Sequence, residues 1–204
     1  MSHQYTIAQV KDLITSMCDP LHFMANHIKI DGEAMMVSEE MKEWAYSACN
    51  WTVAEVGTER QSGRTSFISA FVLWYAMFHE HKTVMYVVPN VQMTKVARQK
   101  IQEMYDSLPE WMRPKLKENN ARCMAFENGA RILFNTASEN TGRGYTINML
   151  VFDEWDLIRE QVKDTLFHNL VPCLINSQVL TTGDGTEWGV FNKPLTVPLS
   201  KVVE

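Results

Sequence analysis

Residues 53–78 read VAEVGTERQSGRTSFISAFVLWYAMF, and this stretch decides how the rest of the sequence is interpreted. A short β-branched run leads into GTERQSGRT, and a long apolar stretch with helical spacing follows. Strand, glycine turn and helix in this order are typical of a phosphate-binding loop, whose backbone N–H groups surround phosphates at the helix N-terminus. Gly63 permits close approach, Arg64 supplies a positive charge, and Thr65 supplies a hydroxyl for magnesium. The alternative is a glycine-containing turn into a buried helix.

The loop departs from the common pattern GxxxxGK[ST] at two positions. Thr58 stands at the first glycine position, with Gly57 one residue early, and Arg64 stands where the pattern has lysine. Arginine keeps the charge, but its planar fork is bulkier than an ammonium group and orients differently. This replacement bears on hydrolysis more than on nucleotide binding.

A second candidate element is LVFDEWD, residues 150–156, an apolar strand that ends in two acids. Asp153 is suited to orienting a magnesium-bound water, and Glu154 to polarising an attacking water. The alternative is an ordinary strand-end turn with solvated acids. The order of the elements, with the glycine loop first and the acids about ninety residues later, favours an ATPase.

Apolar strands alternate with helices along the chain, which predicts an α/β fold with a mostly parallel sheet covered on both faces. We expect strands within 51–56, 82–90, 123–126, 130–136, 147–158 and 177–185, and helices within 6–28 (broken at Pro20), 37–48, 65–81, 91–112 and 158–170. Residues 123–136 should form a hairpin around Glu127-Asn128-Gly129. Ligands of such sheets bind beyond the carboxyl ends of the strands, where ERQSGRT, FDEWD and TTGDG all fall.

Composition restricts the classes of partner. The chain has 204 residues, a net charge of −5 and a pI of about 5.7, so it offers no global basic field for nucleic acid. No apolar run approaches the roughly 18 residues of a membrane span, so no membrane partner is expected. The four cysteines form no CxxC pair and are interpreted as reduced and buried, without zinc: Cys18, Cys49, Cys123 and Cys173.

Taken together, these motifs resemble one family. ERQSGRT is similar to the [GS]RQxGK[ST] loop of the large terminase subunit of tailed phages, the motor that packages DNA into proheads. SLPEWMRP resembles the proline-ended helix after its second strand, and FENGARILFNTASENTGRGYTINMLVFDE its hairpin, RG and acidic strand. SQVLTTGDG lies where the family has its coupling motif. The resemblance covers roughly residues 18–190.

The resemblance implies a role for each matching position. Arg60 corresponds to a loop arginine proposed as a finger in cis, and Arg143 to an arginine that reaches a neighbouring subunit's site. Asp153 and Glu154 correspond to the magnesium-site and catalytic acids. The implied nucleotide-binding residues are Glu59, Gln61, Ser62, Gly63, Arg64, Thr65, Thr181 and Thr182, with Thr65 also a magnesium ligand and the two later threonines forming the coupling motif. The adenine-reading glutamine is not evident; Trp44 or Tyr46 could stack on a base, although core packing explains them more simply.

The implied protein is an ATP- and Mg²⁺-dependent motor domain of the P-loop NTPase (ASCE/RecA-like) class, acting in the host cell cytoplasm and transiently on the prohead. Its implied partners are double-stranded viral DNA, the portal protein and the small terminase subunit. The chain is expected to form a homo-oligomeric ring when assembled and to be a monomer in isolation. We expect a helical extension at 1–50, the ATPase core at 51–190 and a tail at 191–204. The family's nuclease domain does not follow, so a fragment or split gene is expected. Two alternatives remain: a superfamily-two helicase-like ATPase, favoured by DEWD, and a catalytically silent scaffold or regulatory protein.

Overall fold

The computed structural model describes residues 5–57, 62–170, 177–183, 189, 191–195 and 199. Its centre is a seven-stranded sheet in which five neighbouring strands run parallel, and the two strands beyond them are joined by antiparallel pairing. In spatial order the strands are β3 (Val53–Glu55), β9 (Gln178–Thr181), β8 (Met149–Phe152), β4 (Thr83–Val88), β7 (Arg131–Thr136), β6 (Cys123–Phe126) and β5 (Leu116–Asn119). The predicted mostly parallel α/β sheet is confirmed.

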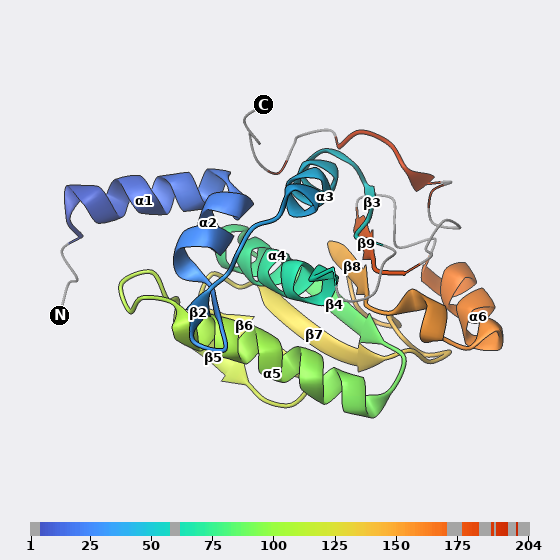
Figure 1. Ribbon diagram of the computed structural model, residues 1–204. Helices are drawn as coiled ribbons and strands as arrows, with labels where there is room; N and C mark the ends of the chain where they lie inside the picture. Colours follow the sequence, from blue (N-terminus) through green and yellow to red (C-terminus); the bar gives the residue numbers. More distant parts are fainter. Residues whose placement is uncertain are drawn as a thin grey trace.

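Side chains of the strands alternate between two apolar cores, one on each face of the sheet. On β4, Val84 and Tyr86 belong to the first core and Met85 and Val87 to the second. The first core is covered by α3 (Glu39–Asn50), α4 (Arg64–Phe78) and α5 (Val91–Ser107), which Figure 1 shows on one side of the strands. The second core is closed by a short 3-10 turn (Trp155–Leu157) and α6 (Glu160–Leu170). Burial on both faces explains why the inner strands are apolar throughout.

The helix after the glycine loop is buried almost all round, as its sequence predicts. Twelve of the fifteen residues of α4 are buried, because the helix lies between the sheet and α3 and α5. The predicted hairpin is also present: β6 and β7 pair antiparallel, and Gly129 turns between them with a φ of 82°. The sequence interpretation missed β5 and the small two-stranded pair β1 (Lys29–Ile30) and β2 (Glu33–Ala34). β5 lies in a polar segment without a strand-like alternation, whereas Ile28-Lys29-Ile30 does alternate and is followed by Asp31-Gly32, a typical hairpin turn.

The N-terminal segment forms two helices that meet at the predicted proline break, α1 (Ile7–Cys18) and α2 (Pro20–His27). Asp19 caps α2 by accepting a hydrogen bond from the Leu21 N–H at 2.8 Å. Phe23 and Met24 of α2 enter the first core, whereas α1 buries only Ser16. Figure 1 shows α1 at the periphery, away from the strands.

The apolar residues of α1 and one of the cysteines are more exposed than their sequence suggests. Ile7, Val10, Ile14 and Met17 all point to solvent. The expectation of buried cysteines holds for Cys49 and Cys123 and is wrong for Cys18, which is exposed because it ends this loosely packed helix; Cys173 lies outside the described residues. None of the described helices is long and apolar enough to cross a membrane.

Candidate functional site

The carboxyl ends of three adjacent strands bring distant motifs together. β3, β9 and β8 are neighbours in the sheet, so the glycine loop, the threonine segment and the acidic segment leave it side by side. The backbone N–H of Val56 donates to the Thr181 carbonyl at 2.7 Å, and that of Thr182 to the Phe152 carbonyl at 2.9 Å. The three motifs therefore occupy one edge, where ligands of parallel sheets bind.

The start of α4 has the geometry of an anion-binding helix terminus. Gly63 caps the helix with a φ of 81°, a left-handed conformation, and a Cβ on it would lie 2.8 Å from the Met41 Cε atom. Glycine avoids both the strain and the clash. The capping residue offers the first N–H groups no side-chain acceptor, which suits them to an external anion.

The two described ends of the loop that precedes α4, Gly57 and Ser62, lie close together. Gly57 has a φ of 61°, and a Cβ on it would lie 2.8 Å from the Trp44 Cζ2 atom and 3.2 Å from the Ser62 Oγ atom. Ser62 thus lies beside Gly57, and the indole of Trp44 packs beneath them. Residues 58–61 between these two ends lie outside the described residues.

Asp153, at the end of β8, accepts hydrogen bonds from three hydroxyl groups. Thr65 of the first turn of α4 donates to Oδ1 at 3.3 Å, and Thr182 donates to the same oxygen at 2.8 Å. Tyr86 of β4 donates to Oδ2 at 2.9 Å. Burial raises the pKa of Asp153 above its ordinary 3.8, although the hydrogen bonds from Thr182 and Tyr86 oppose that rise.

Arg64 and Glu154 form an ion pair across the site. The Arg64 Nη2 atom donates to the Glu154 Oε2 atom at 2.7 Å, and the side chains are 6% and 23% exposed. Glu154 also has a left-handed backbone, with φ 60° and ψ 53°, which non-glycine residues seldom adopt. Its N–H donates to the Thr182 Oγ1 atom at 2.7 Å, which helps to hold this conformation. Such backbone strain gathers at functional sites.

Comparison with known proteins identifies the family. Residues 57–166, more than half of the chain, match the family described as "Terminase large subunit, T4likevirus-type, N-terminal". The chain belongs to this family. The resemblance inferred from the sequence is thereby confirmed. No curated protein sequence matches the chain.

Solved structures share the fold of this terminase domain at low sequence identity. The large terminase of bacteriophage HK97 superposes with a TM-score of 0.67 and 11% identity, over 80% of this chain and 36% of that one. The large terminase ATPase domain of Thermus phage P74-26 gives 0.55 and 14%, over 72% and 64%. The large terminase of a thermophilic bacteriophage, in complex with ADP, gives 0.52 and 14%, over 72% and 39%. The chain thus spans only part of the large terminases that share its fold.

The terminase fold places some of the predicted site residues together and others apart. Thr65, Asp153 and Thr182 meet through hydrogen bonds, and Arg64 meets Glu154. Thr181 instead buries its side chain, and its hydroxyl has no hydrogen-bond partner among the described residues. Arg143 is exposed on the loop between β7 and β8, between Gly142 and Gly144, which both have positive φ. Glu59, Arg60 and Gln61 lie outside the described residues.

Sequence interpretation missed one contributor to the candidate site. Tyr86 is fully embedded in the β4 strand TVMYVV, and its hydroxyl reaches Asp153. The sequence feature that could have revealed it is a tyrosine inside a strand of otherwise mostly apolar residues, since a buried tyrosine hydroxyl usually has a hydrogen-bond partner. Trp44 packs edge-on against Phe67 at 5.5 Å and against the base of the loop, which places it in the core; Tyr46 is 49% exposed.

Two oxygen donors of the site fit magnesium. The Thr65 Oγ1 and Asp153 Oδ1 atoms lie 3.3 Å apart. Adjacent oxygen ligands of an octahedral Mg²⁺ ion, each about 2.1 Å from the metal, lie about 3 Å apart. Hydroxyl and carboxylate oxygens are also the hard ligands that this ion prefers.

Proposed function

We propose that this chain is the ATPase motor domain of a DNA-packaging terminase, which hydrolyses ATP with magnesium and couples hydrolysis to the movement of double-stranded DNA into a prohead. One observation carries the proposal: Asp153 binds Thr65 of the glycine-loop helix and Thr182 of the threonine segment through the same carboxylate oxygen. A strand-end turn with solvated acids does not explain an aspartate that is 3% exposed and holds three motifs together.

Nucleotide phosphates would bind at the N-terminus of α4. Gly63 leaves room for them, the first N–H groups of the helix point toward them, and the helix dipole favours negative charge there. The family fold supports this assignment, since a large terminase of the same fold, from a thermophilic bacteriophage, was solved in complex with ADP. Glu59, Gln61 and Ser62 complete the proposed loop, with Arg60 as a finger in cis.

Thr65 and Asp153 would hold magnesium, which supplies positive charge against the phosphate oxygens. The Thr65 hydroxyl would then face the ion instead of Asp153, while Thr182 and Tyr86 would still orient the carboxylate. The hydrogen bond between Thr182 and the Glu154 N–H ties the threonine segment to the acids. Through it, a change at the phosphates can reach the proposed coupling motif, Thr181 and Thr182.

The Arg64–Glu154 ion pair suggests how the two residues would act without nucleotide and with nucleotide bound. Without nucleotide, each neutralises the other in a largely buried position. When Arg64 turns to the phosphates, Glu154 is left with a free carboxylate that can orient a water and accept its proton as the water attacks the γ-phosphorus. The catalytic base, Glu154, would therefore be released when the phosphate arrives.

The proposed partners follow from the family and from the charge of the chain. With a net charge of −5, a single copy has no broad basic surface for the phosphate backbone that dominates DNA affinity. We therefore place DNA binding in an assembled homo-oligomeric ring on the portal protein, with the small terminase subunit, in the host cell cytoplasm. Exposed Arg143 is proposed to reach a neighbour's site in this ring. The proposed organisation keeps residues 1–50 as an extension, 51–190 as the ATPase core and 191–204 as a tail. Family membership favours this function over a helicase-like ATPase or a silent scaffold.

The test is Glu154→Gln, which keeps the size of the side chain and removes its charge. We expect ATP turnover to fall about a hundredfold or more while ATP binding persists, because the attacking water loses its base. Glu160→Gln is the matched control, since Glu160 is exposed at the start of α6 and pairs only with Lys163 among the described residues. Equal turnover of the two variants would refute the assignment of Glu154 and, with it, the proposed site.

A further inference from the structure

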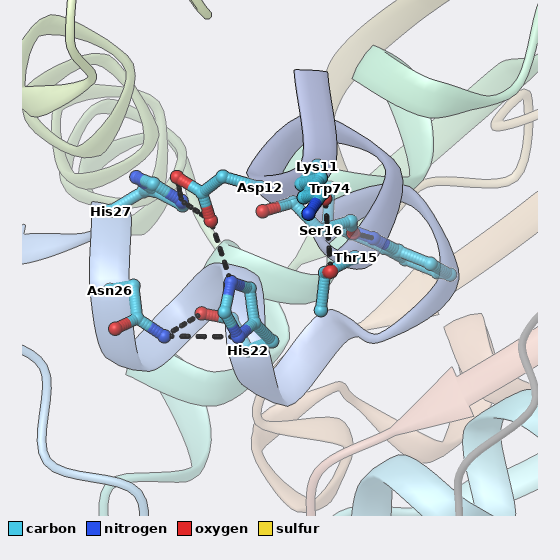
Figure 2. Close-up of polar contacts among 8 residues, drawn as sticks. All are labelled: Lys11, Asp12, Thr15, Ser16, His22, Asn26, His27 and Trp74. Atoms are coloured by element: carbon cyan, nitrogen blue, oxygen red, sulfur yellow. Dashed lines mark hydrogen bonds and ion pairs between the residues drawn. The ribbon is translucent and has the colours of Figure 1, made fainter. Parts of the chain in front are cut away.

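Away from the sheet, one carboxylate and two imidazoles converge at the junction of the first two helices. Asp12 lies on α1, and His22 and His27 lie on α2 (Figure 2). The His22 Nε2 atom is 2.7 Å from the Asp12 Oδ1 atom, and the His27 Nε2 atom is 3.2 Å from the Asp12 Oδ2 atom. The three side chains therefore present their ligand atoms to one point, and these atoms all lie within 4.8 Å of one another.

These separations are near those between the ligands of a tetrahedral metal site. Zinc binds imidazole nitrogen and carboxylate oxygen at about 2.0–2.2 Å, which places neighbouring ligands of a tetrahedron roughly 3.3 Å apart. The Asp12 Oδ1 atom lies 3.3 Å from the His27 Nε2 atom, which matches that value, and 2.7 Å from the His22 Nε2 atom, which is shorter and would lengthen on ligation. Small rotations of the side chains would thus complete three corners of the tetrahedron without any movement of the helices.

The surroundings fix one ligand and leave the others accessible. The His27 side chain is only 7% exposed, and its ring packs edge-on against Trp111 at 6.1 Å and near Phe23 at 6.2 Å. Asp12 and His22 are 32% and 29% exposed, so an ion can enter from their side. The Asn26 Nδ2 atom lies 3.3 Å from the other nitrogen of His22, Nδ1, and donates to the His22 carbonyl at 2.9 Å. When Nε2 binds a metal, the Nδ1–H of His22 would therefore need water or the turned-over Asn26 amide as its acceptor.

Because α1 is weakly packed, a metal bound between α1 and α2 would stabilise its position. This helix buries only Ser16, whose carbonyl accepts a hydrogen bond from the Trp74 Nε1–H at 2.7 Å. Most of its apolar side chains are exposed. A helix that buries so little surface is poorly held by the hydrophobic effect, and metal ligation is a common substitute in small elements.

We propose that Asp12, His22 and His27 bind a zinc ion that fastens α1 to α2, with water as the fourth ligand. Two nitrogens and one oxygen suit zinc and disfavour magnesium or calcium, which prefer oxygen ligands throughout. Binding forms two Zn–N bonds and one Zn–O bond, which replace bonds from hydrated Zn²⁺ to water molecules that return to solvent, and it breaks the hydrogen bonds between Asp12 and the histidines. The hydrogen on each Nε2 moves to Nδ1 in a neutral imidazole or leaves to solvent as a proton from an imidazolium. This site is separate from the proposed ATP site and does not depend on it.

The test is calorimetric titration of the chelator-treated chain with Zn²⁺ in millimolar Mg²⁺, which saturates oxygen-only sites. We expect one zinc per chain, and an affinity lower by about tenfold or more in Asp12→Asn and in His22→Gln. The matched control is His168→Gln, since His168 is exposed on α6. Cys18→Ser should also bind normally, which excludes the exposed thiol as a ligand. Circular dichroism verifies the fold of each variant.

Two further readouts keep the test decisive if a variant unfolds. Co²⁺ added to the unaltered chain should give the strong visible absorption of a four-coordinate ion, and Zn²⁺ should displace it. Zinc should also slow amide hydrogen exchange in α1 and leave α5 unchanged. The proposal is overturned if the unaltered chain shows no saturable zinc binding, or if Asp12→Asn and His22→Gln bind as tightly as His168→Gln. In either case the cluster is only a pair of hydrogen bonds between helices.

Discussion

Two adjacent threonines offer a sharp test of the site, because only one of them takes part in its hydrogen bonds. Thr182 donates to the Asp153 Oδ1 atom at 2.8 Å and accepts from the Glu154 N–H at 2.7 Å. Thr181 is equally buried, but its hydroxyl has no hydrogen-bond partner among the described residues. Replacing each by valine preserves the β-branched shape and removes only the hydroxyl.

We expect the two substitutions to affect the free energy of unfolding differently. In Thr182→Val, loss of a hydrogen bond to a charged group costs about 1.5–3 kcal/mol, and an unpaired buried N–H about 1–3 kcal/mol. Relaxation of the surrounding side chains reduces the sum of these two costs, so we expect the free energy of unfolding to fall by about 2–4 kcal/mol. Thr181→Val removes a buried hydroxyl that already lacks a partner, so stability should stay within about 1 kcal/mol or rise.

The assay is urea unfolding of both variants and the unaltered chain, followed by circular dichroism and tryptophan fluorescence. With a slope of about 2 kcal/mol per molar urea, Thr182→Val should lower the midpoint by about 1–2 M. ATP turnover should fall in the same variant, because Glu154 and Asp153 both lose their orienting contact. Equal midpoints for the two variants, or a larger loss in Thr181→Val, would refute the hydrogen-bond network as drawn.

Three further predictions concern the charges of the site. Tyr86→Phe removes a hydrogen bond that lowers the pKa of Asp153, so this pKa, which burial already raises, should rise further. Magnesium-dependent ATP binding needs the charged acid and is lost as pH falls through that pKa. In titrations of ATP binding against pH, the loss of binding at low pH should therefore begin at a higher pH in this variant. Arg64→Lys should raise turnover about tenfold in steady-state assays, as a compact donor improves contacts to the transition state; lower activity would show a site adapted to the Glu154 ion pair. Arg143→Ala should abolish the rise of turnover per subunit with protein concentration, and identical flat profiles in both proteins would remove its role in trans.

The fold could be predicted because its elements carry strong, local signals. The continuous apolar run of β4 and the apolar circumference of α4 identify a buried strand and a buried helix without any tertiary information. Glycine at position 63 and the acids after β8 then place a site at the carboxyl edge. By contrast, β5 reads LKEN, and it is a strand only because β6 provides a partner. Tertiary pairing overrides weak local preference there.

The site was predictable in its residues and less so in its contacts. The family pattern names Asp153 and Glu154 together, yet only the folded chain shows that one binds hydroxyl groups and the other an arginine. Tyr86 is invisible to motif reasoning, because it lies in a strand between the glycine loop and the acids and reaches the site through the order of strands in the sheet. The cluster of Asp12 with two histidines is similarly hidden, since it forms only where two helices meet.

The two acids of the candidate site have different partners, and this difference suits them to different tasks. Glu154 is paired with a positive charge, so in the proposed mechanism it would act as a base only after Arg64 is drawn away. Asp153 is more buried, and the hydrogen bonds it accepts from the described residues come from uncharged hydroxyl groups of Thr65, Tyr86 and Thr182. A buried carboxylate without a counter-ion is costly, as the raised pKa of Asp153 reflects. A divalent cation would relieve that cost, so the same burial that destabilises the charged acid would favour the proposed magnesium ion.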